Sequence, residues 1–149
     1  GLLHDIGKVA LSAFAGDVLE RVVEDAERSG SPFIESEREL GLPGHDLIGR
    51  KLAEKWRLPG NIVAGIGYHH KTEGPVLITQ AKKAVADMVA LADALCRRSG
   101  VGHGGDPLSP KPSRALLEAL NLTEREVRRL QDALPRAMER SKTFLEILS

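Results

Sequence analysis

Cysteine and aromatic residues are scarce in this 149-residue chain, and neither sign of charge is in excess. Cys96 is the only cysteine, which excludes an internal disulfide and any zinc site built on several thiolates. Aromatic residues make up 3% of the chain, so the core must be largely aliphatic. Basic and acidic residues number 21 each, which argues against bulk binding to nucleic acid or to an anionic membrane. No apolar run approaches the roughly 20 residues that a membrane-spanning helix needs.

The remaining composition is that of a folded domain. Hydrophobic residues make up 42% and charged residues 28%, a globular rather than a disordered mixture, and the length suits one domain of ordinary size. The chain opens at Gly1 without an initiator methionine and without a signal-peptide pattern. We therefore expect a fragment of a longer chain, or a chain that begins inside an element.

Helical periodicity runs through almost the whole sequence. In residues 17–28, for example, Val18, Val22 and Ala26 recur at intervals of four and form one apolar stripe. No strand-like alternation persists and no internal repeat is present, so we expect an all-α bundle with roughly six to eight helices. The expected helices cover residues 17–28, 45–56, 59–70, 77–98, 114–120 and 124 onward.

The carboxy-terminal third carries clear helix-start signals. Ser113 can cap the helix that follows it, and Thr123 with Glu126 forms a capping box. A glycine-rich loop that contains His103 precedes them. We expect residues 1–100 to form a core, and residues 101–149 to add helices that pack on the same domain. Trp56 is expected to anchor that core.

The first candidate for chemistry is the adjacent pair His4 and Asp5. Leu2, Ile6 and Val9 flank it, and burying an imidazole with a carboxylate is costly unless something pairs with them. A second unusual carboxylate is Asp93, which continues the apolar stripe of its long helix. An unpaired buried charge there would be unfavourable, and a neighbouring cation would remove the problem.

Three further histidines lie on helices or at helix ends beside apolar residues. Together with the residues above they form a nitrogen and oxygen donor set without sulfur, which suits manganese, iron, zinc or magnesium and favours hydrolysis. The candidate set is His4, Asp5, His45, His69, His70 and Asp93. From the residues alone, each histidine is equally interpretable as a core side chain that bonds a backbone group, and the set need not converge.

A family resemblance narrows these alternatives. The run from Leu2 to Lys8, Leu-Leu-His-Asp-Ile-Gly-Lys, resembles the signature of the HD superfamily of metal-dependent phosphohydrolases. The HDOD branch is matched by the series that follows. It consists of Glu37 and Glu39, then His45-Asp46-Leu47-Ile48-Gly49, Trp56-Arg57-Leu58-Pro59, His69-His70, Leu91-Ala92-Asp93-Ala94-Leu95 and the leucine-rich tail from Leu116.

The resemblance implies an HD-domain-like helical bundle with extra C-terminal helices, of which residues 1–100 would be the core without its N-terminal helices. It also implies roles for these residues. His4 and Asp5 match the central His-Asp pair, Asp93 matches the final aspartate, and the other three histidines match additional ligands of the related HD-GYP phosphodiesterases. One or two divalent ions would be bound, with Asp5 bridging them while water attacks a phosphoester. Lys8 lies one turn after Asp5 on the same helical face and matches a lysine that contacts phosphate, although a solvated surface position is equally open.

The resemblance also leaves the function divided between classes. It implies a bacterial cytoplasmic signalling domain that binds metal and hydrolyses a phosphoester or nucleotide. Many HDOD members have lost ligands, so a catalytically silent module that binds a signalling protein, or a sensor without turnover, are the alternatives. An HD-GYP-like cyclic dinucleotide phosphodiesterase is a further alternative, but Lys71 and Thr72 follow the histidine pair where those enzymes have glutamate, and no Gly-Tyr-Pro follows.

Overall fold

The structure, a computed structural model, describes residues 2–74, 76–101, 107–108 and 111–148, with residues 140–148 described as backbone only. His103 lies outside the described residues. All regular secondary structure in the described residues is α-helical, with no strand, which confirms the all-α prediction. Its helices are α1 (Ile6–Phe14), α2 (Gly16–Ser29), α3 (Phe33–Glu39), α4 (His45–Lys55), α5 (Gly60–Tyr68), α6 (Gln80–Arg98), α7 (Arg114–Ala119) and α8 (Glu124–Leu148).

Local sequence signals account for most helix boundaries. Helix α2 ends at Gly30, whose φ of 66° places it in the left-handed region that glycine tolerates best. The Ser113 hydroxyl accepts the backbone N–H of Leu116 and so caps α7. The Thr123–Glu126 capping box closes in both directions as expected.

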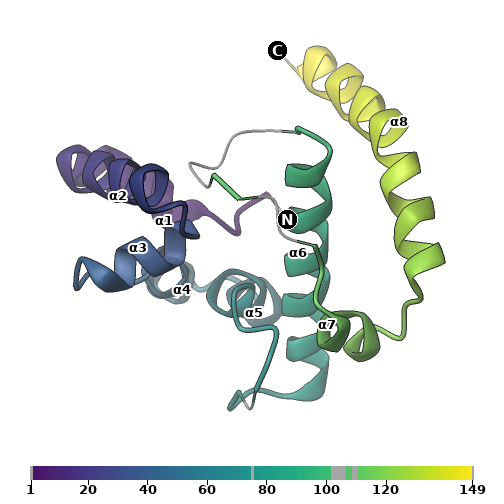
Figure 1. The fold of residues 1–149 in the computed structure, drawn as a ribbon, viewed down its shortest axis with the longest axis horizontal. Coiled ribbons are helices and arrows are strands. Elements are labelled where there is room, and N and C mark those ends of the chain that lie inside the picture. The colour runs from purple at the N-terminus through teal and green to yellow at the C-terminus, as the bar shows by residue number, and fades with distance from the viewer. Residues whose placement is uncertain (1, 75, 102–106, 109–110, 149) are drawn as a thin grey trace.

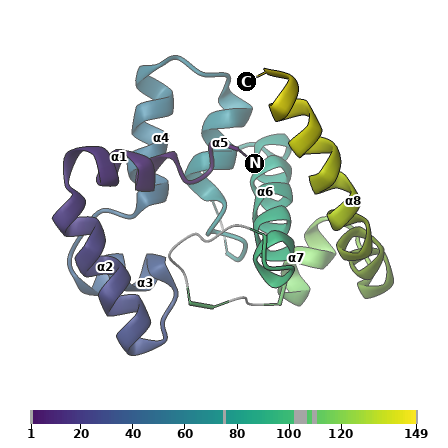
Figure 2. The same ribbon diagram turned by 90° about the horizontal axis from the view of Figure 1, so that it is seen from above.

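Helix α1 packs against α2 and α4, and α3 packs against α2. Helix α5 lies between α4 and the long helix α6 (Figure 1). The chain then returns through α7 and α8, which lie on the far side of α6 (Figure 2). Buried Leu91 and Leu95 of α6 pack with Leu116 of α7 and Val127 of α8, and this aliphatic cluster attaches the last helices. An aliphatic core is what a chain with few aromatic residues requires.

The crossing of α1 over α4 positions the candidate site. A Cβ added to Gly7 would lie 2.0 Å from the backbone oxygen of His45, so only glycine permits this approach. Gly49, one turn further along α4, likewise leaves room for Ile6 and Ile66. The two glycines therefore allow the start of α1 and the start of α4, each of which carries candidate residues, to lie in direct contact.

Two smaller expectations change. Trp56 follows the last residue of α4 and is 55% exposed, so it does not anchor the core as predicted. Phe33 and Ile66 are instead among the largest fully buried side chains. Pro59 precedes α5 rather than lying in its first turn. Within the described residues, no helix combines the length and apolar character that crossing a bilayer requires.

Candidate metal centre

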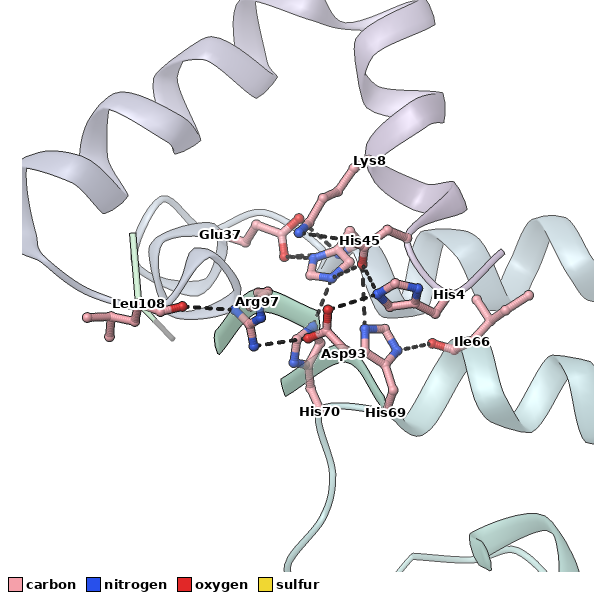
Figure 3. A network of polar contacts seen from close by, with 11 residues as sticks. His4, Lys8, Glu37, His45, Ile66, His69, His70, Asp93, Arg97 and Leu108 are labelled. Atoms are coloured by element: carbon pink, nitrogen blue, oxygen red, sulfur yellow. Dashed lines mark hydrogen bonds and ion pairs between the residues drawn. The ribbon is translucent and has the colours of Figure 1, made fainter. Parts of the chain in front are cut away.

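Asp5 lies at the centre of the candidate cluster, at the N-cap position of α1. Its Oδ1 is 3.3 Å from Nε2 of His45 and 3.6 Å from Nε2 of both His4 and His69. These imidazoles come from the segment before α1, from the start of α4 and from the end of α5 (Figure 3). Three ring nitrogens from distant parts of the chain thus converge on one carboxylate oxygen.

The orientation of His45 is fixed from behind by Glu37. Both side chains are fully buried, and the His45 Nδ1–H donates to Glu37 Oε2 over 2.8 Å. The same carboxylate accepts the backbone N–H of His45 at 2.9 Å. Because a carboxylate can only accept, Nδ1 of His45 must carry the proton, and in the neutral ring the lone pair is on Nε2. The pairing therefore directs that lone pair at Asp5.

His69 is fixed in the same way by the backbone. Its Nδ1–H donates to the carbonyl oxygen of Ile66 over 2.8 Å, which again leaves the lone pair on Nε2. That Nε2 is buried and has no hydrogen-bond partner among the described residues. An unsatisfied buried polar atom is unfavourable by about 1–3 kcal/mol, so its place beside a carboxylate calls for a missing partner.

His70 completes the group from the other side of His45. Its Nε2 lies 2.9 Å from Nε2 of His45, so one proton must be shared between the two rings. Burial, and then the neighbouring charges of His69 and His45, lower the pKa of His70. Burial also opposes charge on His45, but Asp5 and Glu37 outweigh it and raise the pKa of His45.

The carboxylate at the centre is held ionised. Burial alone would raise the pKa of Asp5, but the facing His45 and His69 imidazoles and the Lys8 ammonium hold it well below its usual range. Lys8 lies 3.0 Å from Oδ2, the oxygen that does not face the histidines. The Lys8 ammonium also lies 4.6 Å from the centroid of the Phe33 ring. Lys8 is therefore a partly buried partner of Asp5 and not a solvated surface charge.

Asp93 of α6 joins the cluster through His4. Its Oδ1 lies 3.4 Å from Nε2 of His4, and its Oδ2 lies 3.0 Å from the guanidinium of Arg97, one helical turn away (Figure 3). Burial raises the pKa of Asp93, but His4 and Arg97 together lower it below its ordinary value. The buried charge that the sequence left without a partner is thus neutralised within its own helix.

The structure therefore brings all six predicted side chains together, but two partners were missed. Arg97 could have been found from its spacing, since it follows Asp93 by four residues. Glu37 was noticed only as part of the resemblance, and nothing local in the sequence indicates that it is buried beneath His45.

The apolar setting predicted from Leu2 and Val9 is wrong, since these side chains are 98% and 60% exposed and the surroundings of Asp5 are polar.

This donor set fits a divalent cation. One ligand atom from each of Asp5, His45, His69 and His70 lies within 4.8 Å of all the others. Imidazole nitrogens with a shared carboxylate suit zinc, manganese or iron. The hydrogen bonds from the Nδ1–H groups of His45 and His69 to Glu37 and to the Ile66 carbonyl are of the kind that orient metal-binding histidines. The orphaned Nε2 of His69 supplies independent support, because a cation would be a suitable partner for its lone pair.

Comparison with known proteins decides the family. Residues 1–72 match the sequence model of the HDOD domain. Residues 1–72 are therefore an HDOD domain. The matched segment contains five of the six predicted residues and ends just after the His69-His70 pair, while Asp93 lies beyond it on α6. The HDOD segment therefore contains the cluster around Asp5.

One relative matches a stretch of similar length. An uncharacterized protein of Treponema pallidum (strain Nichols) is 34% identical over 71 residues, which amount to 47% of this chain and 14% of that protein. This chain thus spans only a small part of its relative's length. No solved structure matches the chain.

Proposed function

We propose that this HDOD domain binds one or two divalent cations among His4, Asp5, His45, His69, His70 and Asp93 and hydrolyses a phosphoester in bacterial signal transduction. The observation that supports the proposal most is the buried Nε2 of His69, which faces Asp5 and has no hydrogen-bond partner among the described residues. Zinc, manganese, iron or magnesium each fit the oxygen and nitrogen donors.

Such a cation would supply Lewis-acid polarisation of a phosphoryl oxygen and acidification of a water molecule. The protein's own contribution is orientation. Glu37 and the Ile66 carbonyl hold His45 and His69 with their Nε2 atoms toward Asp5. Together with the His45 and His69 imidazoles, Lys8 holds the pKa of Asp5 below its usual range, and its ammonium would be available to a phosphate oxygen. His4 and Arg97 likewise lower the pKa of Asp93.

Hydrolysis of bis(p-nitrophenyl) phosphate in the presence of manganese tests this activity. His69→Gln should abolish turnover together with metal binding. Lys8→Met should retain at least part of the metal and lower kcat about tenfold or more. Removing one stabilising group from a transition-state site typically has an effect of at least this size. Asp17→Asn, an exposed carboxylate on α2, is the matched control. Turnover that survives His69→Gln would contradict the proposal.

A catalytically silent module that binds a signalling protein is the second candidate. It is supported by a mainly aliphatic cavity of about 540 Å³ between α6, α8 and the segment that joins α7 to α8, bordered by exposed Met88 and Leu130. Under this alternative, the chain would bind metal or a partner without any turnover that depends on His69. Nothing in the described residues specifically supports an HD-GYP-like cyclic dinucleotide phosphodiesterase. A cyclic dinucleotide is therefore one substrate to assay.

A further inference from the structure

A polar cavity opens on the side of the cluster away from His4. It has a volume of about 390 Å³ and lies between α3, α4 and the end of α5. His70, which also belongs to the group around Asp5, forms part of its wall. A molecule in this cavity would therefore lie directly against the candidate metal centre.

Basic side chains outnumber acidic ones in the lining. Arg38, Arg50 and Lys71 face it, against the carboxylates of Glu35 and Asp46. One oxygen of Asp46 already accepts the backbone N–H of Leu47 at 2.7 Å, which reduces its repulsion of an anion. The excess of positive charge in the lining favours a negatively charged ligand.

Arg50 is held in a fixed position in the wall of this cavity. Its guanidinium donates to the Tyr68 hydroxyl over 2.8 Å, and its aliphatic stem runs over Gly67, where an added Cβ would lie 2.5 Å from the Arg50 Cδ. The Nε of Arg50 is buried and makes no hydrogen bond within the described chain; the Glu54 carboxylate is 3.7 Å away. Arginine held in this manner is suited to phosphate, because its planar donors match phosphate oxygens.

We propose that this cavity binds a second phosphate group of the substrate. The substrate class is then a phosphoester or phosphoanhydride that carries two phosphate groups, such as a nucleoside diphosphate. One group would lie at the Asp5 cluster and the other beside Arg50. This inference rests on the proposed function for the first group, whereas the cavity's affinity for phosphate depends on Arg38, Arg50 and Lys71 alone.

Calorimetric titration with inorganic pyrophosphate, compared with inorganic orthophosphate, tests the inference on the chain as purified and again after chelation. The wild type should bind pyrophosphate more tightly than orthophosphate. Arg50→Gln should weaken pyrophosphate binding about tenfold, the usual scale for one charge-assisted hydrogen bond. Arg38→Gln, an exposed position that cannot disturb the fold, should weaken it several-fold, and Glu35→Gln should strengthen it.

Arg98→Gln is the matched control, because Arg98 is exposed at the far end of α6. Thermal midpoints establish that each variant is folded. Pyrophosphate affinity that is equal in the wild type, Arg38→Gln and Arg50→Gln would overturn the inference, as would no binding by the wild type. Arginine-dependent pyrophosphate binding in a chain that takes up no metal even when manganese or zinc is supplied would support the cavity while refuting the proposed function, so the two failures are distinguishable.

Discussion

Glu37 and His45 form a fully buried pair in which one carboxylate accepts both the ring Nδ1–H and the backbone N–H of the same histidine. The pair joins α3 to the first residue of α4 and points Nε2 of His45 at Asp5. A buried carboxylate placed behind a histidine is the arrangement that raises the ligand strength of an imidazole. Glu37 is therefore a positioning residue for the cluster.

Glu37→Gln should weaken metal affinity by about 10- to 100-fold, because an amide in place of the carboxylate no longer fixes the proton on Nδ1 of His45. The measurement is competition for zinc against a chromogenic chelator. Glu39→Gln is the control, since Glu39 lies two residues along the same helix and is exposed. Equal affinities for the two variants would show that Glu37 does not act through His45.

Gly7→Ala should destabilise the fold by about 3 kcal/mol or more, toward the upper end of overpacking penalties. Its methyl group would collide with the backbone of His45, and backbone cannot move aside as a side chain can. Gly16→Ala is the contrasting change, because a Cβ at Gly16 meets nothing within 4 Å and should be neutral or stabilising. Urea denaturation of both variants checks the difference, and similar midpoints would exclude the close α1–α4 crossing.

Leu116→Ala should cost about 2–5 kcal/mol, the range for emptying a buried leucine site. Leu116 is 3% exposed and joins α7 to α6 and α8, whereas Leu130→Ala, at a 46% exposed position, should cost far less. We expect residues 1–100 and the last helices to unfold together. Hydrogen exchange in α4 should therefore accelerate in Leu116→Ala, and exchange confined to α7 and α8 would mean two separate units.

The Cys96 thiol should alkylate slowly at pH 8. Burial, and then the negative charge of Asp93, raise the pKa of Cys96, and only the thiolate is nucleophilic. The pH–rate profile should thus be displaced to higher pH than that of a free cysteine. Asp93→Asn removes the charge and should move the profile back to lower pH, whereas Asp17→Asn should leave it unchanged. Coincident profiles for wild type and Asp93→Asn would place Asp93 away from the thiol.

Local signals in the sequence were enough for most of the fold. The apolar period of α2 and the caps at Ser113 and Thr123 depend on neighbours within a few residues, and such patterns are readable from the chain alone. The exposure of Trp56 was not readable, because it depends on which helices pack beside the end of α4.

For the candidate site too, some features were predictable from the sequence and others required the structure. Residue chemistry and the HDOD resemblance predicted which side chains to suspect, and the structure brings them together around Asp5. The roles of Glu37 and Arg50 could not be predicted, because each depends on a contact between separate helices. Lys8 also required the structure, since a position one turn after Asp5 is compatible with a surface charge or with the observed ion pair.

The metal-to-protein ratio of the wild type and of His69→Gln, measured side by side by inductively coupled plasma mass spectrometry after dialysis with manganese or zinc, tests the central claim most directly. The orphaned Nε2 of His69 predicts at least about one ion per wild-type chain and less than about half an ion per His69→Gln chain. A wild-type ratio below about half, or an unchanged ratio in His69→Gln, would contradict a metal centre at Asp5.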